Sequence, residues 1–417
     1  MSTMEHKVRE TALWLDARAT LDGKECDAST TGAEERLLLD IAGLAPAIRE
    51  RAGEMEAQRR IPPDMVEMLK AIGAFRLFVP RSHGGLELDM PAGLRIIEAL
   101  ARIDGSVGWT AMIGNVAHIL TASLPRETHE RIYGNGPDVM IAGVSQPAGT
   151  AEAVKGGWRV KGRWPFASGC LHADWIGAVC IVTKDGKPLA DPAGNDMPMM
   201  RGFFMPARDW KIEDTWHVAG LKATGSNHVA FADKVVPTEH FFDVATGAPC
   251  LPGPLYQTFL EVLPVAHGAF SVGVARGALD ELIAFARTGR QQLHTAVAMR
   301  DSETFQGELG RAVAEFRAAE ALHQAQAASH WRHALAGTLK DQALLAEATQ
   351  AGVWVSEACV HVVDVCFELA GGSAVYDSSP LQRRLRDMRA GAQHATVHRR
   401  HYAGAGKLLL ASPAPVH

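Results

Sequence analysis

The hydrophobic spacing along the chain changes twice, and this limits the possible folds more than any other feature. From residue 33 to about 133 the apolar residues fall at helical spacing, as between Met65 and Ile72. From 139 to 245, short apolar runs alternate with Gly, Pro, Asp and Asn, and Gly156-Gly157 is typical of a hairpin turn. Beyond Pro252 the helical spacing returns. We therefore predict a mainly α chain with a β middle domain.

The last block consists of long helical segments separated by Gly or Pro, at residues 255–287, 302–336, 341–370 and 380–410. A helix of about 33 residues is roughly 50 Å long, and Ala-rich faces allow helices to approach closely. We predict a four-helix bundle. The expected domains are a polar N-terminal arm (1–32), an N-terminal helical domain (33–138), a middle β domain (139–245) and the bundle (252–411).

Charge and apolar content exclude several functions. Lys and Arg number 42 against 47 Asp and Glu, a net charge of −5, so the basic surface that binds nucleic acid is not expected. No apolar run is long enough to cross a bilayer without interruption, and the first thirty residues contain charges throughout. The six cysteines have no metal-binding spacing. We expect a cytoplasmic protein with no membrane, nucleic-acid or metal partner.

Several short motifs follow one another in a characteristic order. They are Val79-Pro80-Arg81-Ser82-His83-Gly84-Gly85, Gly220-Leu221-Lys222-Ala223-Thr224-Gly225-Ser226 and Leu369-Ala370-Gly371-Gly372. Together with the block order they resemble the acyl-CoA dehydrogenase superfamily over residues 33–410. The segment Gly162-Arg163-Trp164-Pro165-Phe166-Ala167-Ser168-Gly169 resembles the group D flavin-dependent monooxygenases, the oxygenase components of two-component aromatic hydroxylases. The resemblance implies a helical domain, a β-barrel or β-sandwich domain and a four-helix bundle, assembled as a homotetramer.

One departure near the C-terminus distinguishes the branches of the superfamily. Acyl-CoA dehydrogenases commonly remove a substrate proton with a glutamate shortly after an Arg-Asp pair. Here Arg386-Asp387 is followed by no carboxylate up to the C-terminus, and His394 occupies the region, as a histidine does in the monooxygenases. The monooxygenase is therefore the favoured hypothesis. The alternatives are an acyl-CoA dehydrogenase or related FAD-dependent oxidase with its base elsewhere, and a non-catalytic scaffold.

The resemblance also implies a reaction and its partners. Reduced flavin and O2 form a flavin hydroperoxide, which hydroxylates an aromatic or heteroaromatic substrate. The protein must exclude water, hydrogen-bond flavin N5 and orient the substrate, and none of these tasks needs a metal. No strand is followed by a GxGxxG motif for nicotinamide binding, so a separate flavin reductase is expected to supply the reduced flavin.

Three residues match catalytic positions of the family. Ser168 matches the serine beside flavin N5, because a neutral hydroxyl can both donate and accept, although a turn serine would look the same. His118 matches a histidine that faces the substrate, whereas its apolar helical surroundings alone indicate a core residue. His394 is a second acid–base candidate that also contacts substrate. It shares a possible helix face with His398 and His401, so a surface histidine is the alternative.

Other residues match cofactor positions. Trp109 and Phe166 resemble aromatics near the isoalloxazine ring, and Ser145 lies in a strand-end loop expected to contact flavin and substrate. Arg290, or Arg287 in another register, matches an arginine that reaches a flavin phosphate across a subunit interface. Gly371 and Gly372 match a turn that approaches the cofactor closely. Glu368 replaces a dehydrogenase glutamine on the adenine side, which favours reduced FMN over reduced FAD.

Overall fold

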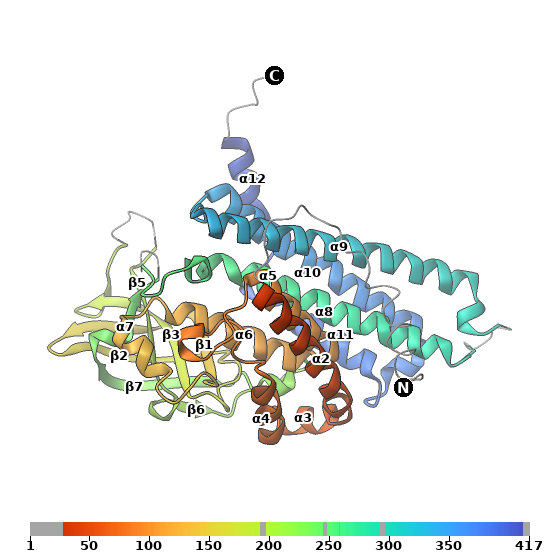
Figure 1. Ribbon diagram of the computed structural model, residues 1–417, viewed down its shortest axis with the longest axis horizontal. Coiled ribbons are helices and arrows are strands. Elements are labelled where there is room, and N and C mark those ends of the chain that lie inside the picture. Colours follow the sequence, from red (N-terminus) through yellow and green to blue (C-terminus); the bar gives the residue numbers. More distant parts are fainter. Residues whose placement is uncertain (1–27, 192–196, 245–247, 258, 292–296, 412–417) are drawn as a thin grey trace.

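Helices, strands and helices follow one another along the chain and form adjoining parts of the molecule (Figure 1). The computed structural model describes residues 28–411 except 192–196, 245–247, 258 and 292–296. The sheet lies at one end, and the long helices extend away from it. This arrangement confirms the predicted mainly α fold with a β middle domain.

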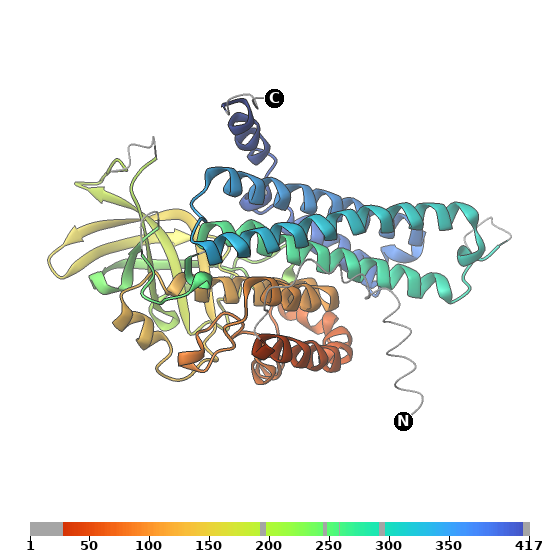
Figure 2. The same cartoon turned by 45° about the horizontal axis from the view of Figure 1, so that its top comes forward.

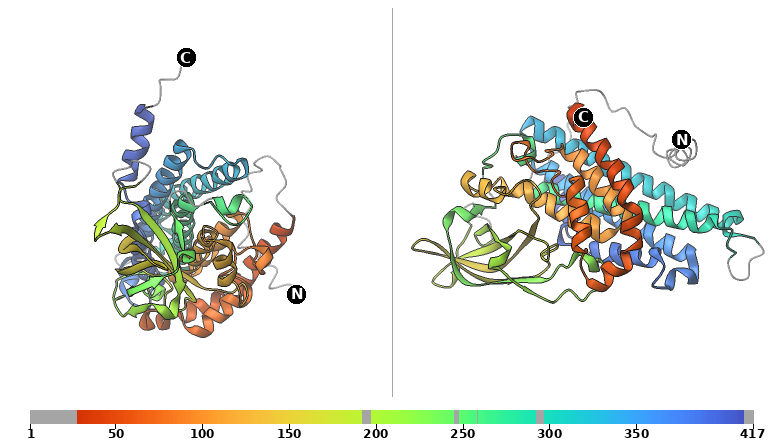
Figure 3. Two further views of the ribbon diagram at one scale, coloured as in Figure 1. Left: turned by 90° about the vertical axis from the view of Figure 1, so that its left-hand side faces the viewer. Right: turned by 60° about the horizontal axis from the view of Figure 1, so that its bottom comes forward.

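The N-terminal helices cover the region between the sheet and the long helices. They are α2 (Ala28–Glu50), α3 (Ala52–Gln58), α4 (Pro63–Ile72), α5 (Met90–Ile103), α6 (Gly105–Thr121) and α7 (Arg126–Ile132). The Asp104 carboxylate ends α5 and starts α6 by accepting hydrogen bonds from the Ser106 and Val107 amides. Helix α2 packs on α5 (Figure 3), whereas α6 packs on both β1 and α8. Helix α6 therefore contacts both the middle domain and the bundle, and it is buried on nearly every face.

Helix α2 begins before residue 33, where the N-terminal helical domain is predicted to start. Residues 28–32 of the predicted arm already belong to α2, and the remainder of the arm, residues 1–27, lies outside the described residues.

The sheet has the strand order β6-β7-β2-β1-β3-β5-β8, with the short β4 paired to β3. Its strands are β1 (Ile141–Val154), β2 (Gly157–Trp164), β3 (Trp175–Lys184), β4 (Lys187–Pro188), β5 (Met200–Pro206), β6 (Lys211–Glu213), β7 (His228–Val236) and β8 (Phe241–Asp243). Strands β1 and β3 are parallel and the other pairs are antiparallel. The predicted hairpin at Gly156-Gly157 is confirmed, because Gly156 has φ +93° and Val154 pairs with Gly157.

Strand β1 is irregular where it passes the site. Its pairing with β3 shifts between Val144 and Pro147 and again between Pro147 and Gly149. Such bulges change the direction of side chains that would otherwise alternate strictly. Ser145 and Gln146 lie in this irregular stretch.

The C-terminal helices are α8 (Phe259–Arg287), α9 (Glu303–Ala336), α10 (Gln342–Ala370), α11 (Pro380–Gly391) and α12 (His401–Ala411). Helices α8, α9 and α10 run side by side, and α12 projects from the body of the molecule (Figure 2). By length and composition alone, α8 and α10 could cross a membrane, but α8 is a buried core helix packed on α5, α6, α9 and α10.

The predicted fourth helix of the bundle is wrong in one respect, because residues 380–410 form two helices. Helix α11 ends at Gly391, whose carbonyl accepts a hydrogen bond from the buried His267 Nε2 at 3.0 Å. A Cβ at Gly391 would lie 2.6 Å from the Phe270 ring, so only glycine allows this close approach. The following residues leave the helical path, form the turn η8 (Ala395–Val397), and enter α12 from a new direction.

Candidate active site

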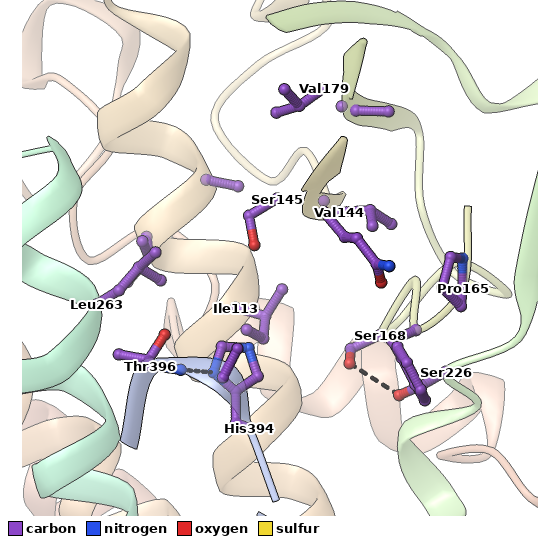
Figure 4. Close-up of a pocket in the computed structure, with 18 of the residues that line it drawn as sticks. Ile113, Val144, Ser145, Pro165, Ser168, Val179, Ser226, Leu263, His394 and Thr396 are labelled. Carbon is purple, nitrogen blue, oxygen red and sulfur yellow. Dashed lines mark hydrogen bonds between the residues drawn. The ribbon is translucent and has the colours of Figure 1, made fainter. Parts of the chain in front are cut away.

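A cavity of about 370 Å³ lies where the three parts of the molecule meet (Figure 4). Helices α6 and α8, strands β1 and β3, the loop after β2 and the segment after α11 all contribute to its wall. The lining is largely apolar, and its polar side chains include Ser145, Gln146, Ser168, Ser226, Gln393 and His394. None of the described residues that line it is Asp, Glu, Lys or Arg. The cavity is therefore suited to a flat, largely apolar ligand that needs a few hydrogen bonds.

Ser168 lies on this wall in a fixed hydrogen-bonded position. The Trp109 indole N–H donates to Ser168 Oγ at 3.0 Å, and Ser168 Oγ lies 2.7 Å from Ser226 Oγ. The turn that carries Ser168 is also bonded through its backbone, since the Gly169 amide donates to the Thr224 carbonyl at 2.8 Å. Two sequence motifs far apart in the chain, around residues 168 and 226, thus form one wall of the site.

Phe166 presents an aromatic ring beside Ser168. Its backbone has φ +67°, a left-handed conformation that is uncommon outside glycine. The side chain is 60% exposed in a position that lines the cavity, and its ring meets Trp216 edge to face at 6.1 Å. An unusual backbone conformation that exposes a large aromatic side chain at a cavity is typical of a binding site.

His394 lies on the wall formed by the segment after α11. Its Nδ1 accepts a hydrogen bond from the Thr396 amide at 3.3 Å, so the neutral ring carries its proton on Nε2. Within the described residues Nε2 makes no hydrogen bond and remains available to a ligand. Burial lowers the pKa of His394, and a proton on Nδ1 would also face the Thr396 N–H. His394 is therefore a neutral hydrogen-bond donor at pH 7.

Trp109 lines the cavity beside His394, and His267 supports this wall from behind. Trp109 meets Phe270, His267 and His394 edge to face, with ring centroids 5.0, 5.6 and 5.7 Å apart. Ser145, which belongs to strand β1, also lines the cavity. The structure thus brings Trp109, Ser145, Phe166, Ser168 and His394 together at one cavity, while their individual roles stay predictions.

The expected position of His118 requires correction. His118 is fully buried and does not belong to the cavity wall. His118 Nδ1 lies 2.9 Å from Tyr133 Oη, and His118 Nε2 lies 3.0 Å from the Phe75 carbonyl oxygen. Burial lowers its pKa to about 4. His118 is a hydrogen-bonded core histidine, because its face of α6 is turned toward Tyr133 and Phe75, which follow α7 and α4.

Arg290, Arg287, Gly371 and Gly372 are also not at the cavity in this chain. Arg287 is the last residue of α8, Arg290 follows it, and both are exposed. Gly371 and Gly372 begin the turn η7 (Gly371–Val375), which follows α10. Helices α8 and α10 both run away from the sheet, so these residues lie at the far end of the long helices (Figure 1). A contact with flavin bound in a neighbouring subunit stays a prediction for all of them.

Sequence reasoning missed several residues that complete the site. Ser226 belongs to the motif Gly220 to Ser226, but its position at the cavity depends on a contact with a residue 58 positions away. Trp216 and Gln393 line the cavity, and His267 supports it. Only Ser226 had a signal in the sequence, as part of that motif.

The loop that carries Ser226 is attached to α11. The Leu221 amide donates to Asp387 Oδ1 at 2.6 Å, and Arg386 Nη1 donates to the Ala219 carbonyl at 2.6 Å. Leu221 has φ +53°, so this hydrogen bond holds a left-handed residue in place. The Arg-Asp pair thus positions the loop rather than lining the cavity itself.

Known families and proteins match the chain over most of its length. The model of the acyl-CoA dehydrogenase N-terminal domain matches residues 43–125, and that of the C-terminal domain matches residues 265–399. Indole-3-acetate monooxygenase from Pseudomonas putida is 33% identical over 369 residues, which cover 88% of this chain and 92% of that protein. The flavin-dependent monooxygenase oxygenase subunit HsaA from Rhodococcus jostii is 33% identical over 374 residues, covering 84% and 92%.

Solved structures agree with these relatives. The 3-HSA hydroxylase from a Rhodococcus species superposes with a TM-score of 0.83 at 30% identity, covering 91% of this chain and 97% of that one. XiaF from a Streptomyces species, in complex with FADH2 and glycerol, gives a TM-score of 0.85 at 25% identity, covering 94% and 98%. The chain therefore belongs to the acyl-CoA dehydrogenase family and, within it, to the flavin-dependent monooxygenases.

Proposed function

We propose that the cavity is the site where an aromatic or heteroaromatic compound is hydroxylated, with reduced flavin from a separate reductase and O2 as co-substrates. One oxygen atom enters the product and the other leaves as water, while the reduced flavin gives up two electrons. Related proteins are named indole-3-acetate monooxygenase and, from a Rhizobium species at 29% identity, FADH2-dependent resorcinol hydroxylase. Both names describe small aromatic substrates.

The uncharged wall of the cavity is the observation that carries this proposal. A flavin ring is flat, largely apolar and edged with hydrogen-bonding atoms. The apolar lining, the exposed Phe166 ring and the Ser168 hydroxyl match those requirements. When bound, reduced flavin supplies the electrons that activate O2. The described residues provide a cavity with few polar groups, which restricts the water and stray protons that would divert the reaction to peroxide.

Ser168 and His394 have distinct proposed tasks. Ser168 hydrogen-bonds the flavin at N5, and His394 Nε2–H donates to an oxygen or nitrogen atom of the substrate. Ser145 lies on the β1 side of the cavity, where it can hydrogen-bond either ligand. Each of these groups is neutral, so none needs a counter-ion when the cavity closes around its ligands.

The alternative of an acyl-CoA dehydrogenase lacks a base at the site. That reaction needs a carboxylate to accept a substrate proton, and the described lining residues include none. The last acidic residue of the sequence, Asp387, is instead hydrogen-bonded to the Leu221 amide. The uncharged lining thus favours the monooxygenase.

The flavin tail and the assembly belong to the same proposal. We infer a homotetramer in which Arg290 reaches the flavin phosphate of a neighbouring chain, and reduced FMN is favoured because Glu368 cannot donate a hydrogen bond to an adenine ring. Equilibrium titration under argon measures the dissociation constants of reduced FMN and reduced FAD, and we expect the value for reduced FMN to be lower. A reduced FAD affinity far above that for reduced FMN would contradict it.

The function is tested with purified protein, photoreduced flavin and 18O2, using a panel of phenols and indoles. We expect a product that carries one 18O atom, and a product-to-peroxide ratio that falls to zero when the protein is omitted. Flavin binding without any labelled product across the panel would contradict the proposed chemistry. Bleaching of bound oxidised FAD by an acyl-CoA would favour the dehydrogenase, and failure to bind flavin in either redox state would favour a scaffold.

A further inference from the structure

Three hydroxyl groups form a continuous hydrogen-bonded chain that includes the wall residues Ser168 and Ser226. Trp109 Nε1 contacts Ser168 Oγ at 3.0 Å, and Ser168 Oγ contacts Ser226 Oγ at 2.7 Å. Ser226 Oγ contacts Thr224 Oγ1 at 2.7 Å, and Thr224 Oγ1 donates to the Leu221 carbonyl at 2.8 Å. All four side chains are buried. We call Ser168, Ser226 and Thr224 the hydroxyl relay.

The two ends of the hydroxyl relay give it a direction. An indole N–H can only donate, and a carbonyl oxygen can only accept. Three hydroxyl protons remain for the three contacts beyond Trp109. Every contact contains a proton only if Ser168 donates to Ser226, Ser226 donates to Thr224, and Thr224 donates to the Leu221 carbonyl.

The accepting end of the relay cannot easily move. The Leu221 carbonyl also accepts from Trp216 Nε1 at 3.0 Å, while the Leu221 amide is bonded to Asp387. With φ +53°, Leu221 occupies a backbone region that few residue types tolerate, so the surrounding hydrogen bonds define its orientation. The direction of the relay is thus set by the backbone and by α11.

The consequence appears at Ser168, the relay residue closest to the proposed flavin position. Its only proton is directed at Ser226, and one of its two acceptor positions is filled by Trp109. What it offers to a ligand in the cavity is therefore a second acceptor position. Reduced flavin carries a hydrogen on N5 and can donate there, whereas N5 of oxidised flavin is an acceptor and would face a lone pair.

We propose that Ser226 and Thr224 are positioning residues that make the site select reduced over oxidised flavin, by fixing Ser168 as a hydrogen-bond acceptor. This inference rests on the proposed function, because it requires N5 to lie against Ser168. If Ser168 donated to oxidised flavin, only two protons would remain for the three contacts beyond Trp109. One pair of oxygen atoms, 2.7 or 2.8 Å apart, would then face each other without a proton between them.

The inference is tested by the ratio of the dissociation constants for oxidised and reduced flavin. The variant Thr224→Val keeps the shape of the side chain but removes the hydroxyl that fixes the direction. The variant Ser226→Ala removes the acceptor of the Ser168 proton. In both, Ser168 is free to donate into the cavity, so we expect oxidised flavin to bind more tightly. The ratio should fall about tenfold, the effect of one hydrogen bond.

The same change is measured independently as a reduction potential. A tenfold fall in the ratio for a two-electron carrier lowers the midpoint potential of bound flavin by about 30 mV. Thr224→Ser keeps the hydroxyl and should retain the ratio of the natural protein. Thr110→Val is the matched control, because Thr110 is a buried threonine of α6 that donates to the Ser106 carbonyl outside the relay.

The outcomes separate this inference from the proposed function. If both flavin states bind but Thr224→Val and Ser226→Ala leave the ratio and the potential unchanged, the relay does not select the redox state, and the monooxygenase proposal stands. A ratio that falls equally in Thr110→Val would also overturn the inference, since it would reflect a general loss of packing. If neither flavin state binds to the natural protein, the proposed function itself fails.

Discussion

At the residue scale, His394 and Ser168 face one cavity with their protons committed differently. The Thr396 amide donates to His394 Nδ1, which leaves an N–H donor on Nε2, whereas the hydroxyl relay as proposed directs the Ser168 proton at Ser226. The cavity therefore offers one fixed donor and one fixed acceptor. Groups fixed in this way need little rearrangement when a ligand binds, which is the property that makes preorganised sites effective.

The variant His394→Ala should keep flavin binding but lose control of the substrate. We expect the ratio of hydroxylated product to free hydrogen peroxide to fall by a factor on the order of 10 to 100, because the substrate loses its donor. Product and peroxide are quantified in the same reaction. His398→Ala, an exposed histidine beyond the cavity, is the control. An unchanged ratio in His394→Ala would remove His394 from the mechanism. The ratio should also be flat above pH 6.5, where the imidazole is neutral.

His118 should behave as a structural residue. Replacing it with leucine keeps much of its volume but leaves Tyr133 Oη and the Phe75 carbonyl without their partner. We expect a loss of roughly 1–3 kcal/mol in the free energy of unfolding, measured by denaturant titration. Flavin and substrate affinities should be unchanged. Weaker substrate binding with normal stability would instead indicate that His118 reaches the cavity in solution.

At the element scale, α11 determines the shape of a loop from the middle domain. Asp387 accepts the Leu221 amide, and a Cβ at Gly220 would lie 2.0 Å from the Arg386 carbonyl, so loop and helix are in direct contact. Through Leu221, this contact also holds the far end of the hydroxyl relay. The Arg-Asp pair therefore acts on the cavity from a distance.

The variants Asp387→Ala and Asp387→Asn separate the role of this carboxylate as a hydrogen-bond acceptor from its ability to titrate. Alanine removes the acceptor of the Leu221 amide and should lower stability by roughly 1.5–3 kcal/mol, whereas asparagine keeps an acceptor oxygen. Burial and the nearby Asp104 raise the pKa of Asp387 to about 7. The folded state thus holds this proton more tightly than the unfolded state, and the stability it contributes is lost as pH rises from about 4 to 7.

Denaturant titration of the natural protein and of Asp387→Asn at pH 5, 6 and 8 checks whether stability falls as pH rises. We expect the natural protein to lose stability relative to Asp387→Asn as pH rises through this range. A difference that is constant with pH would show that the carboxyl titrates at its ordinary value in the fold.

Sequence patterns predict those elements that depend on neighbouring residues. The predictions that are wrong concern features that depend on residues far apart in the chain. The Gly156-Gly157 hairpin depends on residues that are adjacent in sequence, so it could be predicted. The break after Gly391 depends on His267 and Phe270, which lie more than 120 residues earlier, and no proline between Gly391 and α12 indicates it. His118 was misplaced for a related reason. Helix α6 is buried on nearly every face, so its periodicity does not show which face meets the cavity.

At the scale of the whole molecule, α12 presents apolar side chains outward. Leu409 and Leu410 are 75% and 89% exposed, while Tyr402 bonds the start of the helix to Glu357 of α10 at 2.9 Å. We expect light scattering to give four times the 44.8 kDa chain mass. We expect Leu409 and Leu410 to pack against a neighbouring subunit of the proposed homotetramer. The double variant Leu409→Asp/Leu410→Asp would bury two charges at that contact and should give a smaller assembly. Val235→Asp, on strand β7, is the control. A monomeric natural protein would contradict the prediction.

Acid should destabilise the whole protein through its buried histidines. Burial lowers the pKa of His118, His129, His323 and His330 to about 4 and that of His267 to about 3. The unfolded state takes up these protons near pH 6.5, so stability is lost as pH falls from about 6.5 to 4. Asp387 and Glu98, with pKa values raised to about 7, act in the opposite direction. Thermal midpoints measured from pH 7 to 5 should fall, and a flat profile would contradict this.

The shared construction of the cavity wall has a consequence for protein engineering. Ile113 comes from α6, Val144 from β1 and Leu263 from α8, so all three parts of the chain shape the space for the substrate. Chimaeras that exchange one part between relatives would join two half-cavities of different shape. Mutant libraries that vary these three positions together keep the backbone intact, and should change the range of accepted aromatic compounds with less loss of folding.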